Sequence, residues 1–247
     1  MRDVTAAEWR KAWTGHAWWL LAAFGVFLSL LASVGFATQA EQQLADRQTD
    51  LAAVTDELVR SWFMLLLFSA LFGAVLVTKE FGSGAISRSV LLSGGRDRLF
   101  AAKLLAGTVM GLLYGVLAAA LAAATPFLFL PGIGQEPEWS GDTTLTLLGV
   151  FVVTVLAAPW GVLIGWLLRN QVAAVGTLLG LTLLVDESLL RLAPDLGRFT
   201  MTIAMSSVYR DGKPELLSVP MALAVIVAWL ALAGFVSRRL FVTRDIS

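Results

Sequence analysis

Six long apolar segments constrain the fold of this 247-residue chain more than any other feature. A helix that crosses about 30 Å of hydrocarbon at ~1.5 Å per residue needs about 20 mostly apolar residues. The segments of about this length are Ala17–Thr38, Ser61–Thr78, Leu104–Leu130, Thr143–Leu168, Val172–Val185 and Val219–Ser237. Only 15% of the residues are charged, against about 25% in soluble domains. The sequence therefore predicts an all-α polytopic membrane protein, a single domain over 1–247 with six transmembrane helices.

The residue types that are missing exclude several kinds of function. The chain has no Cys and one His, His16, so disulfides, thiolate metal sites and His-cluster sites are excluded. No G-x-x-x-x-G-K-[ST] phosphate loop occurs, and the predicted spans hold no His and no interior pair of acids. We therefore expect no catalytic, cofactor-binding or metal site on this chain.

The distribution of Lys and Arg predicts the orientation in the membrane. With the N-terminus inside, the predicted inner segments carry 12 basic and five acidic residues, and the outer segments carry six basic and 13 acidic residues. Basic residues accumulate on the cytoplasmic side of membrane proteins. Both termini are therefore predicted to be cytoplasmic.

Residues 1–16 have the pattern of a helix that lies in the membrane interface. Trp9, Trp13 and Ala17 share one helical face, and Arg10 and Lys11 lie away from it. Trp concentrates at the boundary between lipid and water, where amphipathic helices lie in the headgroup plane. An N-terminal interfacial helix is predicted.

The region between the last two spans, residues 186–218, is predicted to be a large external segment. Asn170–Val185 is 16 residues, which is short for a fifth span, so Asp186 and Glu187 are placed near the outer leaflet or in a wet cavity. Leu189–Tyr209 is apolar but interrupted by Pro194. This pattern favours a re-entrant or interfacial helical pair, with one amphipathic surface helix as the alternative.

Glycines recur at four-residue spacing in three spans. They are Gly107, Gly111 and Gly115 in the third, Gly161 and Gly165 in the fourth, and Gly176 and Gly180 in the fifth. Small residues on one face allow helices to approach closely in lipid. Each stripe is compatible with a dimer interface, a moving seam or static packing within one chain.

The loop between the second and third spans, residues 79–103, is the most informative segment. It starts with Lys-Glu-Phe at the membrane edge, and Ala85–Leu92 can form a short helix that ends at Gly94. Ile86, Val90 and Leu91 would lie on a side separate from Arg88. A peripheral partner could bind such a helix through its apolar side. An ordinary basic loop that lies on the lipid surface would have the same periodicity, so both interpretations remain open.

With its pattern Glu80-Phe81…Gly84…Leu91-Leu92…Arg96…Lys103, the chain resembles the permease subunits of ABC-2-type transporters over nearly its whole length. Gly84-Ala85 and Ser93-Gly94-Gly95 depart from the family pattern, which often has Gly-Thr and a Pro there. The resemblance implies that the loop is a coupling helix that docks on a separate ATPase subunit. The residues implied in coupling are Lys79, Glu80, Phe81, Ile86, Arg88, Val90 and Leu91.

The resemblance also implies the partners. Two permease copies would join two ATPase subunits, with ATP and Mg on the ATPase and none on this chain. The permease contact would involve the first and fifth spans, including the small face of Ala173, Gly176, Thr177 and Gly180.

The resemblance implies an exporter driven by ATP hydrolysis on its partner. Because no predicted span interior carries a charge, we expect an amphipathic or hydrophobic cargo such as a drug, antibiotic, peptide or lipid-like molecule, with Asp186 and Glu187 at its exit. Fourteen Arg against four Lys point to a high-GC bacterium and hence to the bacterial cell membrane. The alternative is a non-transport membrane protein, either an immunity or assembly factor or an unfamiliar membrane enzyme.

Overall fold

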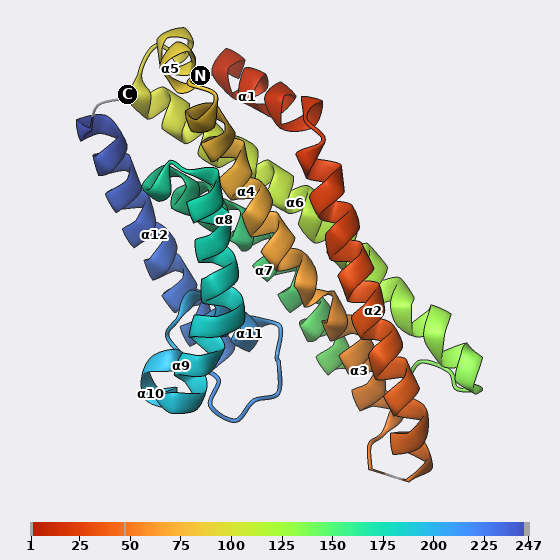
Figure 1. Ribbon diagram of the computed structural model, residues 1–247. Coiled ribbons are helices and arrows are strands. Elements are labelled where there is room, and N and C mark those ends of the chain that lie inside the picture. Colours follow the sequence, from red (N-terminus) through yellow and green to blue (C-terminus); the bar gives the residue numbers. More distant parts are fainter. Residues whose placement is uncertain (1, 47, 245–247) are drawn as a thin grey trace.

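The computed structural model describes residues 2–46 and 48–244, and these form helices joined by turns and short connections (Figure 1). The elements are α1 (Arg2–Thr14), α2 (Ala17–Ala45), α3 (Leu51–Arg60), η1 (Ser61–Met64), α4 (Leu65–Gly82), α5 (Ile86–Ser93), α6 (Arg96–Phe129), η2 (Leu130–Ile133), α7 (Gly141–Leu168), α8 (Gln171–Gly180), η3 (Leu181–Val185), α9 (Asp186–Leu192), α10 (Pro194–Gly197), α11 (Met201–Val208) and α12 (Val219–Thr243). Six helices, some built from several of these elements, are long and apolar enough to cross a membrane. The predicted class, an all-α polytopic membrane protein, is confirmed.

Three of the predicted spans were too short, because each was bounded at the nearest charged residue. The second apolar helix starts at Leu51, and the third starts at Arg96 and carries Lys103 inside it. The fifth runs over Gln171–Leu192 through the π-helical turn η3, so the prediction of a short fifth span that ends at Val185 is wrong. These charges do not stop α6, in which Lys103 is fully buried while Asp97 and Arg98 are exposed.

The two described ends of the chain lie at the same end of the bundle as α5, while α9 and α10 lie at the opposite end (Figure 1). Asp245, which the charge count placed with the inner segments, lies outside the described residues. The helix α1 packs against α6 and meets α2 at the turn around Gly15 and His16. Because α1 ends at Thr14, Ala17 belongs to the next helix and does not continue the Trp9–Trp13 face.

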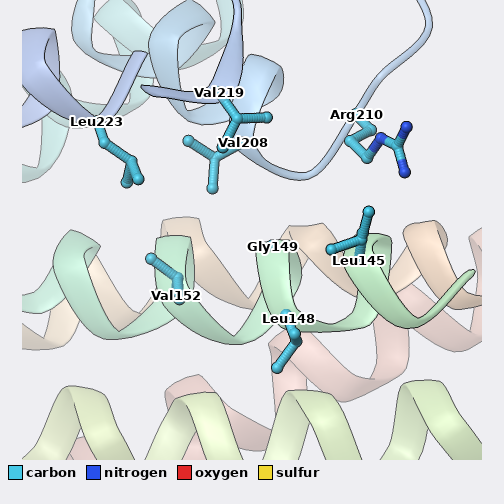
Figure 2. A pocket seen from close by; sticks show the side chains of 8 residues that line it. All are labelled: Leu145, Leu148, Gly149, Val152, Val208, Arg210, Val219 and Leu223. Carbon is cyan, nitrogen blue, oxygen red and sulfur yellow. The ribbon is translucent and has the colours of Figure 1, made fainter. Parts of the chain in front are cut away.

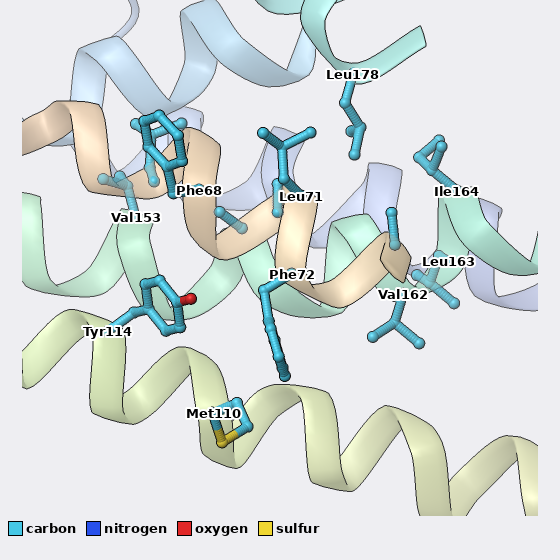
Figure 3. Packing of buried hydrophobic residues seen from close by; sticks show 14 of the residues in the cluster. Phe68, Leu71, Phe72, Met110, Tyr114, Val153, Val162, Leu163, Ile164 and Leu178 are labelled. Carbon is cyan, nitrogen blue, oxygen red and sulfur yellow. The ribbon is translucent and has the colours of Figure 1, made fainter. Parts of the chain in front are cut away.

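The helix α4 is the centre of the core. It packs against α7, α6, α2 and α8, and most of its residues are buried. Figure 3 shows Phe68, Leu71 and Phe72 of α4 between the side chains of α6, α7 and α8. The rings of Phe72 and Tyr114 lie 5.9 Å apart. The apolar faces of α4 thus set the positions of the helices around it.

Two of the three glycine stripes pack within the chain. A Cβ on Gly161 would lie 1.7 Å from the carbonyl oxygen of Ala70 in α4, and one on Gly111 would lie 2.6 Å from Cβ of Ala158 in α7. Small residues bring helix backbones together in this way. For the third and fourth spans, static packing within one chain is therefore sufficient to explain the stripes.

The segment after the fifth span folds back against the bundle. It forms the short helices α10 and α11, and α11 is buried against α7 and α12. The alternative of one amphipathic surface helix is therefore wrong, and the helical-pair interpretation describes the segment better.

Candidate functional site

A short helix, α5, lies at the same end of the bundle as α1 and the C-terminal end of α12 (Figure 1). Gly84 and Gly94 flank it with φ angles of 67° and 73°. Glycine reaches this left-handed region without the steric cost of a Cβ, and it is the usual residue just after a helix. The two glycines therefore limit α5 to Ile86–Ser93.

The apolar residues of α5 divide between two faces. Ile86 is only 4% exposed and belongs to the core, and Val90 packs against that core. Leu91 and Leu92 are 81% and 79% exposed, and Arg88 is also exposed. The prediction that Ile86, Val90 and Leu91 share one partner-facing side is therefore wrong. The leucine pair faces out, because the bundle covers the other side.

Next to α5 lies an ion cluster of Glu8, Lys11, Glu80 and Lys103, which we call the buried ion cluster because all of it but the 41% exposed side chain of Lys11 is buried. The Nζ atom of Lys103 lies 2.7 Å from Oε2 of Glu8 and 2.9 Å from Oε1 of Glu80. The Nζ atom of Lys11 lies 2.6 Å from Oε1 of Glu8 and 3.0 Å from Oε1 of Glu80. These bridges join α1, α4 and α6, which are far apart in the sequence.

The charges of the buried ion cluster balance. Lys103 is fully buried, and the two carboxylates are nearly so. Charges in such a place are stable only when each has an opposite charge in contact. Burial alone would lower the pKa of Lys11, but Glu8 and Glu80 raise it above its ordinary value, so Lys11 is protonated at neutral pH.

The buried ion cluster contacts α5 directly. Nζ of Lys11 donates to Oγ of Ser89 at 3.2 Å, and Nζ of Lys79 donates to the carbonyl of Lys11 at 3.3 Å. Glu80 forms its salt bridges with Lys11 and Lys103. Of the residues predicted for coupling, the structure brings Lys79 and Glu80 together here and leaves Arg88 on the surface.

Phe81, also predicted for coupling, packs beside the buried ion cluster rather than within it. Its ring meets that of Trp166 edge-on at a centroid distance of 5.8 Å, and the guanidinium carbon of Arg169 lies 5.6 Å from its centroid. A cation over an aromatic face is a favourable arrangement. Phe81 therefore fixes the end of α4 against the turn between α7 and α8.

Sequence reasoning missed Glu8 and Lys103 as functional candidates. Lys103 was counted as a loop charge near a span end, and Glu8 as one acid of an interfacial helix. The usable signal was the pair Glu8 and Lys11 at three-residue spacing, together with a lysine eight residues inside α6. A lysine at that depth requires a buried acid, and α1 supplies one.

At the opposite end of the bundle, a cavity of about 440 Å³ lies between α2, α4, η3 and α11. One part of its lining is aromatic, with the rings of Phe63 and Tyr209 stacked at 5.0 Å. Another part is charged, where Nζ of Lys213 lies 2.9 Å from carboxylate oxygens of both Glu187 and Asp211. We call it the outer cavity because it lies at the end of the bundle away from α5, and it is large enough for a small amphipathic molecule.

The two acids predicted at the exit have different surroundings. Asp186 is 4% exposed, and its Oδ2 accepts a hydrogen bond from the backbone N–H of Thr202 at 3.2 Å, at the start of α11. Glu187 lines the outer cavity and also bridges to Arg191 at 3.3 Å. Of the two acids predicted at an exit, Glu187 lines this cavity, whereas Asp186 accepts from the backbone of α11.

The small face predicted for permease contact is not covered within the chain. A Cβ added at Gly176 or Gly180 would meet nothing within 4 Å, and Ala173 is exposed. Thr177 is partly exposed on the same helix, α8. This stripe differs from those of Gly111 and Gly161, whose neighbours belong to the same chain.

The comparison with curated proteins returned no match. A comparison with protein families matched residues 5–185 to the family described as ABC-2 family transporter protein. The match includes most of α1, all of α5 and the whole buried ion cluster. The chain therefore belongs to the ABC-2 family of transporter proteins.

Proposed function

We propose that this chain is the permease of an ABC exporter that moves an amphipathic or hydrophobic cargo outward. Membership of the ABC-2 family gives it a permease role in ABC transport, as a transmembrane subunit whose ATPase activity lies on another chain. The observation that carries the proposal is α5, a short helix with two exposed leucines held at one end of a bundle of six apolar helices. A peripheral ATPase can bind such a helix through its exposed leucines.

The exposed pair Leu91 and Leu92 supplies the ATPase contact in this proposal. Binding between proteins depends on a few apolar anchors that become buried in a groove of the partner. Two ATPase subunits would bind ATP and Mg, one beneath each of two permease copies. The α5 end of the bundle would then be cytoplasmic, in a bacterial cell membrane, in agreement with the charge distribution.

The buried ion cluster would transmit movement of α5 to the spans. Ser89 of α5 contacts Lys11, and Lys11 bridges to Glu8 and Glu80. Oε2 of Glu80 is buried and has no hydrogen-bond partner among the described residues. It therefore keeps capacity for a further bond when α5 moves. In this way ATP-driven movement would reach α1, α4 and α6 together.

We expect Leu91→Asp to reduce co-purification of the cognate ATPase at least tenfold, because a carboxylate would have to be desolvated in the apolar groove of the partner. Membrane insertion should be unchanged, since Leu91 is exposed and leaves no cavity. The measurement is affinity purification of the tagged permease with quantification of the bound ATPase.

The matched control is Leu192→Asp, the same change at a residue of α9 that is 86% exposed at the other end of the bundle. It should leave ATPase binding intact. Equal ATPase binding by the Leu91→Asp and Leu192→Asp variants would show that α5 is only a linker.

Cargo would leave through the outer cavity, whose aromatic and acidic parts suit an amphipathic cation. We expect Glu187→Gln to slow export of cationic amphiphiles several-fold more than export of neutral ones, because it removes a negative charge from the lining. The assay is uptake into inverted vesicles that contain the permease and its ATPase. Glu136→Gln, which changes an exposed acid outside that lining, is the control. Equal slowing of both cargo classes by Glu187→Gln would contradict the role.

A further inference from the structure

A second cavity, distinct from the outer cavity, opens on the side of the bundle between α7, α11 and α12. It measures about 330 Å³ and is lined by Leu145, Leu148, Gly149, Val152, Val208, Arg210, Val219 and Leu223. In Figure 2, α7 forms one wall, with Val208, Val219 and Leu223 across from it and Arg210 at one end. We call it the lateral groove. Apart from Arg210, its lining side chains are aliphatic.

The position of the lateral groove matches that of a lipid. Two of the helices that are long and apolar enough to cross a membrane begin beside it, at Gly141 and Val219, which would put its Arg210 end at a membrane boundary. Gly149 allows α7 to reach the end of α11, because a Cβ there would lie 2.3 Å from the carbonyl oxygen of Val208. The groove therefore extends from the boundary into the apolar layer, as an acyl chain does.

The backbone of Arg210 is unusual for a residue that has a side chain. Its φ is 61°, and its N–H bonds the carbonyl of Ser207 while that of Asp211 bonds the carbonyl of Ser206. This is the helix-ending pattern in which glycine normally takes the left-handed position. A residue with a side chain in this position has a backbone cost that the contacts around it must offset.

The charges at the mouth of the lateral groove form a close pair. Nη1 of Arg210 donates to Oδ1 of Asp142 at 2.7 Å, and the Asp142 side chain is 75% exposed. A guanidinium has five N–H donors and binds phosphate well, and an exposed carboxylate accepts from an ammonium. The pair therefore presents a cation and an anion side by side, the complement of a head group with a phosphate and a primary ammonium.

We propose that the lateral groove binds a phospholipid of the phosphatidylethanolamine type. One acyl chain lies along the aliphatic lining, the phosphate lies against Arg210, and the ammonium lies against Asp142. The bound lipid fills the seam between α7, α11 and α12. This assignment is independent of the cargo and of the ATPase partner.

The test uses the purified, delipidated full chain in detergent, incubated with phosphatidylethanolamine, phosphatidylcholine or phosphatidylglycerol of the same acyl chains. Native mass spectrometry counts the retained lipids. We expect at least fivefold more retained phosphatidylethanolamine than either other lipid. Phosphatidylcholine has no N–H to donate to Asp142, and phosphatidylglycerol has no ammonium.

Arg210→Gly is the decisive variant, because glycine suits the left-handed backbone and its lipid-free melting temperature should not fall. Retention of phosphatidylethanolamine should drop at least fivefold. Asp142→Asn, which leaves the backbone of Arg210 unchanged, should abolish the preference over phosphatidylcholine. Arg198→Gln, which breaks another outer ion pair, with Asp195, should change neither readout.

Two results would overturn the proposal. One is unchanged phosphatidylethanolamine retention in both the Arg210→Gly and the Asp142→Asn variants. The other is equal retention of the three lipids by the unaltered chain. That result would mean that the lateral groove binds acyl chains without distinguishing between head groups.

Discussion

Lys103→Met is expected to destabilise the helix bundle by about 3–5 kcal/mol, because removing one partner of a buried ion pair leaves an uncompensated buried charge. Of the four residues of the buried ion cluster, Lys11 alone would then bridge Glu8 and Glu80, so the cluster would carry a net negative charge. Methionine is similar in length to lysine, so little volume is lost. The measurement is thermal unfolding in detergent, followed by the loss of monodisperse protein.

The control is Arg191→Met, the same change of charge at a side chain that is 77% exposed. Exposed ion pairs contribute little to stability, so its melting temperature should equal that of the unaltered chain. A melting temperature for Lys103→Met within a degree of the unaltered value would show that the buried ion cluster does not support the fold.

A second change separates stability from coupling. In the Lys103→Met background, Glu8→Gln restores charge balance, because Glu80 and Lys11 remain as a pair. We expect the double variant to recover most of the melting temperature. ATP-driven transport should remain low, because Lys103, which links α6 to both Glu8 and Glu80, is still absent.

The sequence was sufficient to predict the six apolar helices and the position of α5. Both depend on local signals, namely apolar length and the glycines at 84 and 94. The end of the fifth helix could not be predicted in this way. Asp186 was interpreted as a stop, yet the helix continues through η3 into α9, because α11 folds back and donates the Thr202 N–H to its carboxylate.

The burial of charged and apolar side chains required the tertiary structure. Periodicity placed Ile86 and Leu91 on one candidate face of α5, but only the bundle determines that Ile86 is covered and Leu91 is exposed. Lys103 was placed just before its predicted span, whereas it is the eighth residue of α6 and is fully buried. Its partner Glu8 lies 95 residues earlier in the chain, and no local pattern joins the two.

Glycine spacing is the clearest case of one pattern with different outcomes. Gly111 and Gly161 meet backbone or side chains of the same chain, whereas Gly176 and Gly180 face open space. A four-residue repeat of glycine shows only that one face of the helix carries small residues. Which helix packs against that face depends on the spatial arrangement of all six apolar helices.

We expect Gly161→Ala to destabilise the helix bundle strongly, because Gly161, unlike Gly176, lies against the backbone of another helix. The added methyl group would lie 1.7 Å from the carbonyl oxygen and 2.6 Å from the carbonyl carbon of Ala70, and a backbone cannot move aside as the end of a side chain can. The seam between α4 and α7, where Gly73 also lies, would have to open. Overpacking of a core typically costs about 1–3 kcal/mol, and a backbone clash belongs at or above the upper end of that range.

Gly161→Ala should therefore reduce the yield of monodisperse protein severalfold and lower the melting temperature of what remains. The matched variant Gly176→Ala adds the same methyl group on α8, where it meets nothing, and should melt at or above the unaltered temperature. The larger Gly176→Leu should also leave the single chain folded. If α8 forms the contact between permease copies, Gly176→Leu should weaken cross-linking of copies through an introduced cysteine pair. Similar melting temperatures for Gly161→Ala and Gly176→Ala would contradict the tight α4–α7 seam on which the placement of every other helix depends.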